Sequence, residues 1–133
     1  MLELAKPKID SPDQPQTLEA QDRSPITLTI GDNVTALTNT RVIIECAASG
    51  VPTPIVTWTK DGQEITNDVR YTVQDDNSLL IGGSLQGDSA QFTCAAINIA
   101  GEDTSSSTVK IVGKLFSHET RIRIVVFSLV TYS

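Results

Sequence analysis

The chain has 133 residues, of which 39% are hydrophobic, and this content is enough to build one core of about 100 residues. Between Pro25 and Val112, ten acidic residues stand against four scattered basic ones, and the whole chain carries a formal net charge of −6. An acidic body without a continuous basic stripe argues against nucleic acid as a partner.

Residues 1–24 have the composition of a linker. Pro7, Pro12 and Pro15 stand among charged residues and glutamines, and this mixture predicts a flexible N-terminal linker. The segment has no apolar run of the length that a signal peptide needs. We therefore expect no signal peptide in this chain.

From residue 25 onward, apolar and polar residues alternate in the period of a β-strand. Turn residues separate the runs, as at Gly31-Asp32-Asn33 and Asp61-Gly62. No helical pattern of ten residues interrupts the series, so we predict an all-β domain over 25–112. In chain order, the predicted strands contain residues 25–30, 34–37, 41–46, 56–59, 71–73, 79–81, 92–96 and 104–112.

Three residues on these strands have a characteristic spacing. Cys46 and Cys94 each lie on a predicted strand with the side chain pointing inward, and Trp58 lies on a strand between them. A Cys, Trp and Cys triplet at this spacing is typical of an immunoglobulin-type sandwich. The triplet predicts a fold and its stability, and no catalytic group accompanies it.

Longer motifs extend this likeness over about two-thirds of the chain, and together they resemble the I-set immunoglobulin domain. The motifs are Gly50-Val51-Pro52-Thr53-Pro54, Trp58-Thr59-Lys60-Asp61-Gly62, Leu79-Leu80-Ile81, Asp88-Ser89-Ala90-Gln91-Phe92-Thr93-Cys94 and Ala96-Ile97-Asn98-Ile99-Ala100-Gly101. The resemblance implies a two-sheet antiparallel sandwich. Its short turns look most like those of matrix and adhesion members, including hemicentin-type and ADAMTS-like proteins.

The resemblance also implies structural roles for particular residues. Cys46 and Cys94 would form a disulfide across the two sheets, and Arg70 would pair with Asp88 at the base of the sandwich. The family usually has Tyr at the position of Phe92, so one corner hydrogen bond is expected to be absent here. We expect the core to contain Trp58, Phe92, Leu79, Ile81 and Leu85.

The same resemblance implies a recognition module without catalytic activity, outside the cell, where thiols oxidise. Its partners would be matrix or cell-surface proteins. Because a disulfide-bonded sandwich usually lies outside the cell and residues 1–24 lack a signal peptide, we expect the chain to be a fragment or an isoform of a larger protein. The sequence leaves one alternative open, an intracellular structural domain of the muscle-filament kind with reduced cysteines.

Two surface features bear on recognition. Asn33-Val34-Thr35 satisfies the N-glycosylation rule, and we expect Asn33 in a turn that leads to an edge strand. The alternative is an unmodified asparagine. A small uncharged face is expected on two central strands, and an ordinary solvated sheet is its alternative. Its members are Thr57, Thr59, Thr93, Ala95 and Ile97.

Other polar groups fit no cofactor or metal site. The two cysteines and the lone His118 cannot complete a tetrahedral zinc site. Asp75-Asp76-Asn77 lacks the spaced carboxylates of a calcium loop, so we interpret it as a solvated turn. Glu102-Asp103 lacks the supporting groups of a hydrolase, and we interpret these residues as surface charges.

Residues 113–133 change composition abruptly and are not expected to belong to the domain. Ile122 to Val130 is rich in β-branched residues but is less than half as long as a membrane-spanning helix, so we expect no complete membrane span. This run resembles an extra strand or an aggregation-prone segment. Alternative splicing or a truncated gene model would explain it.

Overall fold

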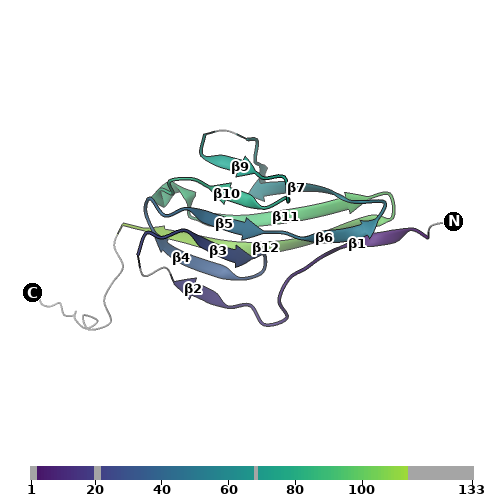
Figure 1. The fold of residues 1–133 in the computed structure, drawn as a ribbon, viewed down its shortest axis with the longest axis horizontal. Coiled ribbons are helices and arrows are strands. Elements are labelled where there is room, and N and C mark those ends of the chain that lie inside the picture. The colour runs from purple at the N-terminus through teal and green to yellow at the C-terminus, as the bar shows by residue number, and fades with distance from the viewer. Residues whose placement is uncertain (1–2, 20–21, 68, 114–133) are drawn as a thin grey trace, which may run out of the picture.

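The computed structural model describes residues 3–19, 22–67 and 69–113, and it has two facing sheets of β-strands (Figure 1). The predicted C-terminal segment 113–133 lies, except for Gly113, outside the described residues. The all-β sandwich predicted from the sequence is confirmed. The one helix among the described residues is the short 3₁₀ turn η1 (Gln86–Asp88).

Each sheet has a simple order of neighbouring strands. The smaller sheet has the order β3-β5-β10-β9, which are Ile26–Thr29, Val42–Glu45, Leu79–Ile81 and Tyr71–Val73. The larger has the order β2-β4-β12-β11-β7-β8, which are Thr17–Glu19, Asn33–Leu37, Gly101–Val112, Ala90–Asn98, Ile55–Lys60 and Gln63–Glu64. A separate pair joins β1 (Ala5–Ile9) to β6 (Ala48–Val51).

The core forms because alternate residues of each strand point between the sheets. On β11, Phe92, Cys94 and Ala96 are all fully buried, while their neighbours are at least partly exposed. On β5, Val42 and Ile44 alternate in the same way. Of the expected core residues, the structure buries Trp58, Phe92, Leu79 and Ile81.

A disulfide joins Cys46 to Cys94 across the sandwich, with a Cα–Cα distance of 6.6 Å. Trp58 lies directly opposite Cys94 in the pairing of β7 with β11 and is 1% exposed. Its indole N–H donates a hydrogen bond of 2.9 Å to the carbonyl of Asn77. The bridge and the indole together fill the centre of the core.

Leu85 was expected in the core, but the structure leaves it 49% exposed. The reason is that Asp88 occupies the inside of this corner and is only 2% exposed. The backbone N–H of Leu85 donates to the Asp88 carboxylate over 2.6 Å. Leu85 therefore supports the corner through its backbone, with its side chain toward solvent.

The prediction of a flexible linker over residues 1–24 is wrong for the part that the structure describes. β1 pairs antiparallel with β6, with Pro7 and Ile9 buried, and β2 pairs parallel with β4. Proline is tolerated because β1 is an edge strand, where a missing N–H breaks few ladder bonds. The N-terminal segment is therefore part of the sandwich (Figure 1).

Three strand pairs are parallel, whereas the resemblance implied an antiparallel sandwich. They are β4 with β12, β2 with β4, and β3 with β5. The chain leaves β1 at Asp10 and returns through β2 and β3 before it reaches β4. This connection adds β2 to the larger sheet and β3 to the smaller one, and it buries Leu28 and Ile30 in the core.

The buried position of Ile9 gives a first testable prediction. Replacing Ile9 by Ala should lower the free energy of unfolding by about 2 to 4 kcal/mol, because the side chain is 4% exposed in the core cluster. Urea unfolding followed by tryptophan fluorescence measures this change. The control Val69→Ala, at a site 98% exposed, should change it by less than about 0.5 kcal/mol. Equal stabilities of Ile9→Ala and the unmodified chain would show that β1 is detached in solution.

Candidate functional site

The five residues expected to form a binding face lie together on β7 and β11. Thr57 is paired with Ala95 and Thr59 with Thr93, while Ile97 lies opposite Ile55. Residues directly opposite in an antiparallel pair project from the same side of the sheet. We call Thr57, Thr59, Thr93, Ala95 and Ile97 the β7–β11 face.

The centre of this face is uncharged and its corners are acidic. Thr93 shares a hydrogen bond of 2.7 Å with Ser106 of β12, so the hydroxyl-bearing surface continues onto a third strand. Glu64 is paired with Thr59 at one side and Glu102 with Ile97 at the other, and both carboxylates are exposed. The face can therefore offer apolar and hydroxyl contacts in the middle and attract cations at its rim.

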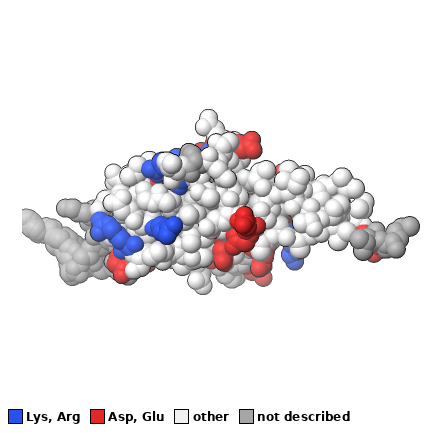
Figure 2. Space-filling view, turned by 45° about the horizontal axis from the view of Figure 1, so that its top comes forward, with Lys and Arg blue, Asp and Glu red and all other residues white. Residues whose placement is uncertain are grey.

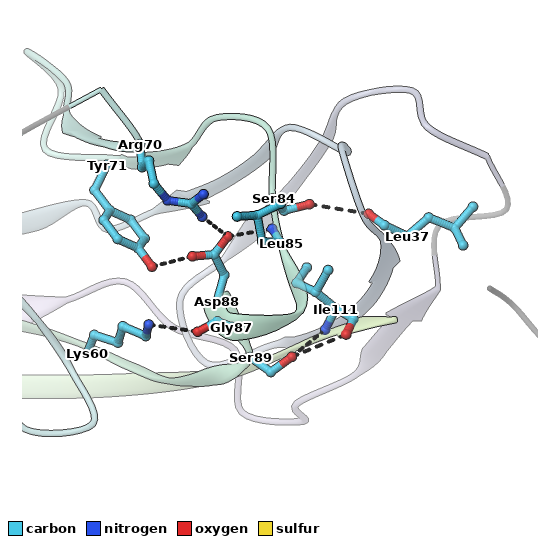
Figure 3. A network of polar contacts seen from close by, with 10 residues as sticks. All are labelled: Leu37, Lys60, Arg70, Tyr71, Ser84, Leu85, Gly87, Asp88, Ser89 and Ile111. Atoms are coloured by element: carbon cyan, nitrogen blue, oxygen red, sulfur yellow. Dashed lines mark hydrogen bonds and ion pairs between the residues drawn. The ribbon is translucent and has the colours of Figure 1, made fainter. Parts of the chain in front are cut away.

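The corner before β11 is organised by Asp88 (Figure 3). Its carboxylate accepts hydrogen bonds from the Arg70 guanidinium, the Tyr71 hydroxyl and the Leu85 N–H. Arg70 and Asp88 also form the ion pair that the resemblance implied. Burial alone would raise the pKa of Asp88, but these hydrogen bonds and the charge of Arg70 outweigh it and hold the pKa below its usual range.

Tyr71 has a role that sequence reasoning missed. The hydroxyl expected two residues before Cys94 is absent at Phe92, but Tyr71 on β9 supplies a hydroxyl to Asp88 from the other sheet. Its ring lies 6.2 Å from the Phe92 ring, and Arg70 lies 5.8 Å from the Tyr71 ring centroid. Burial and the hydrogen bond to Asp88 raise the pKa of Tyr71 to about 12.

Asn98 and Asp103 hold the N-terminal strand in place. The Asn98 side-chain amide donates to the carbonyls of Ala5 and Pro52, each over 2.9 Å. Asp103 accepts a hydrogen bond of 2.7 Å from the Ile9 N–H. The interpretation of Asp103 as an ordinary surface charge was therefore wrong.

Asn33 does not lie in an open turn. It is the first residue of β4, between β2 and β12, and its side-chain oxygen accepts a 2.8 Å hydrogen bond from the Thr108 N–H. The side chain is nevertheless partly exposed. A glycan attached to the amide nitrogen would leave this acceptor oxygen in place.

The acidic turn at Asp75-Asp76-Asn77 has a structural role. Asp76 accepts hydrogen bonds from the backbone N–H and the hydroxyl of Ser78, and these bonds lower its pKa. The same turn presents the Asn77 carbonyl to Trp58. Within the residues that the structure describes, no cluster of three or more His, Cys, Asp or Glu side chains could hold a metal ion.

Comparison with known protein families shows which family this chain belongs to. The model of the immunoglobulin I-set domain matches residues 25–111. The chain belongs to the I-set family. Proteins of this family are generally non-catalytic. No helix in the described part of this I-set chain is long and apolar enough to cross a membrane.

Several curated proteins contain a similar I-set domain. Hemicentin-1 of Mus musculus is 39% identical over 74 residues, which are 55% of this chain and 1% of that protein. Neural cell adhesion molecule 1 of Bos taurus is 41% identical over 85 residues, 62% of this chain and 10% of that protein. ADAMTS-like protein 1 of Homo sapiens is 32% identical over 84 residues, 63% of this chain and 5% of that protein. The chain thus spans a tenth or less of the length of these relatives.

Solved structures with the same fold include a domain of titin. Titin domain M7 is 26% identical, with a TM-score of 0.62 over 84% of this chain and 99% of that one. The neural ectodermal development factor IMP-L2 is 26% identical, with a TM-score of 0.57 over 59% of this chain and 38% of that one. Both likenesses agree with the sandwich described above.

The raised pKa of Tyr71 gives a prediction about pH. Because the folded pKa is about 12 and the ordinary value is 10.0, Tyr71 contributes stability that is complete below pH 10 and is lost as the pH rises through 12. Tyr71→Phe should cost about 2 kcal/mol at pH 7, where a bond to a charged acceptor is lost.

Urea unfolding of both proteins from pH 7 to pH 12 measures this difference. The unmodified chain and Tyr71→Phe should differ by a constant amount up to about pH 9, and the difference should shrink above pH 10. The two proteins share every other titrating group, so the difference between them reports on Tyr71 and needs no separate control. A difference that stays constant up to pH 12 would contradict the assignment of Tyr71 to this corner.

Proposed function

We propose that this I-set domain is a non-catalytic extracellular module that contacts matrix or cell-surface proteins. The observation that carries the proposal is the β7–β11 face, which lies on two central strands and is uncharged at its centre. Small β-branched side chains make such a face flat and leave little conformational entropy to lose on binding. Glu64 and Glu102 at its rim would favour a partner with basic residues around a similar flat surface.

The extracellular placement is supported by the disulfide and by the relatives. Disulfides form and persist in oxidising compartments, and Cys46 is bonded to Cys94. One of the relatives is named a neural cell adhesion molecule. We extend that adhesive role to this chain as a proposal, together with glycosylation of Asn33.

A second candidate function is an intracellular structural domain of the muscle-filament kind. The observation that favours it is the likeness to titin domain M7, which covers 84% of this chain. This alternative requires that Cys46 and Cys94 are reduced and that Asn33 carries no sugar. The two functions therefore differ in covalent chemistry that can be measured.

The compartment is decided by the intact mass of the protein from its natural source. The extracellular function predicts that Cys46 and Cys94 are alkylated only after reduction, and that glycosidase treatment removes any mass on Asn33. Protein from the same source, alkylated without reduction, is the control. Two thiols that react before reduction, with no sugar on Asn33, would favour the filament function instead.

The binding face is tested by placing a charge on it. Thr93→Arg puts a long cation at the centre of the β7–β11 face and should weaken binding at least tenfold for any partner found in a panel of purified matrix and cell-surface ectodomains. The matched control Thr72→Arg places the same charge on β9 of the other sheet, at an exposed position. Biolayer interferometry with the full chain measures both. Partners that bind both variants equally would place the contact elsewhere.

A further inference from the structure

Exposed apolar side chains gather at one end of the sandwich. The described residues include six large hydrophobic side chains that are exposed, and four of them lie where β11 ends and β12 begins. We call these four the apolar pole. They are Leu4, Ile55, Ile97 and Ile99, which are 59%, 73%, 46% and 80% exposed.

Strand pairing and the side-chain amide of Asn98 place the residues of the apolar pole next to one another. Ile55 and Ile97 are direct partners across β7 and β11, and Ile99 follows in the turn between β11 and β12. Asn98 anchors the start of β1, next to Leu4, by its hydrogen bonds to the carbonyls of Ala5 and Pro52. Paired strands therefore hold Ile55 and Ile97, while Asn98 fixes the turn of Ile99 and the segment next to Leu4 by its bonds to Ala100 and Ala5. The apolar pole would lose little entropy on docking.

Both signs of charge border the apolar pole. Glu102 is paired with Ile97 and is exposed, while the exposed Lys6 packs its alkyl stem over Gly101. Figure 2 shows a largely uncharged surface toward this end of the molecule. The border holds one cation, Lys6, and two anions, Glu102 and the exposed Glu3 beside Leu4. A twofold axis can place Lys6 of each copy against Glu102 of the other, so this border can pair with a copy of itself.

We infer that the apolar pole binds a second copy of this chain, end to end. The whole chain carries a net charge of −6, and contact at the poles keeps two acidic bodies as far apart as the molecule allows. Contact between the β7–β11 faces would instead bring those bodies side by side and place Glu64 and Glu102 near like charges. Screening acts over about 8 Å at physiological salt, so end-to-end contact avoids most of this repulsion.

The contact is small, so the self-association is weak and reversible. Four side chains and two charged neighbours cover less than the area of a standard interface of about 1,600 Å². Ile97 belongs to both surfaces, but this association goes beyond the proposed function because it uses the end of the domain and leaves Thr57, Thr59 and Thr93 free. Thr93→Arg therefore tests the face, and substitutions of Ile99 test the pole.

Sedimentation equilibrium of the full chain, from about 10 µM to about 500 µM, tests this inference. The chain should show a monomer–dimer equilibrium, and Ile99→Ser and Ile55→Ser should each weaken it at least tenfold. Val69→Ser is the matched control, because Val69 is 98% exposed beside Arg70 at the other end of the sandwich. It should leave the dimer unchanged. A chain that stays monomeric throughout, or a dimer that Ile99→Ser does not weaken, would overturn the inference.

A charge exchange tests the geometry of the contact. Lys6→Glu and Glu102→Lys should each weaken the dimer severalfold, because each puts like charges together at two symmetric places. The double variant restores unlike pairs and should return the dissociation constant to within about twofold of the original. Circular dichroism of each variant shows that the monomer remains folded. Failure of the double variant to restore a dimer that both single variants weaken would overturn the twofold arrangement.

Discussion

The bridge between Cys46 and Cys94 is the constraint on which the rest of the sandwich depends. It joins the residue that follows β5 in one sheet to the middle of β11 in the other, and Trp58 lies beside it on β7. A buried indole N–H without an acceptor would cost about 1 to 3 kcal/mol. The Asn77 carbonyl removes that penalty, and Asp76 and Ser78 hold the turn that presents it. The tryptophan at the centre of the core thus requires a polar turn at the edge of the sandwich to supply its acceptor.

The sandwich could be predicted because its local signals agree with one another. Alternation placed Phe92 and Cys94 inward, and Asp61-Gly62 ended a strand where the structure has a turn. The roles of Tyr71 and Asp103 could not be predicted in this way. Asp103 accepts from the N–H of Ile9, 94 residues earlier, and no local pattern specifies a partner at that distance. The five residues of the β7–β11 face were predictable because the period of a strand fixes their side of the sheet.

In the N-terminal segment, the high proline content obscured the alternation that is typical of a strand. Lys6-Pro7-Lys8-Ile9 alternates like a strand, and Pro7 and Ile9 are indeed buried, but the proline content of residues 1–24 indicated a linker. Composition averages over a segment, whereas an edge strand needs only a few well-placed apolar residues. The parallel pairing of β3 with β5 is harder to foresee, because alternation specifies a face and leaves the direction of the neighbour open.

The β7–β11 face and the apolar pole differ in whether the local structure already accounts for their residue types. Threonine favours strands, so Thr57, Thr59 and Thr93 would suit a solvated sheet even without a partner. The local structure does not favour an isoleucine at position 99 in this way. Ile99 is 80% exposed and lies in a turn, where polar residues and glycine are usual. Asn98 and Gly101 beside it meet the needs of that turn. Folding thus gives no reason for an isoleucine at position 99, and a contact at the pole supplies one.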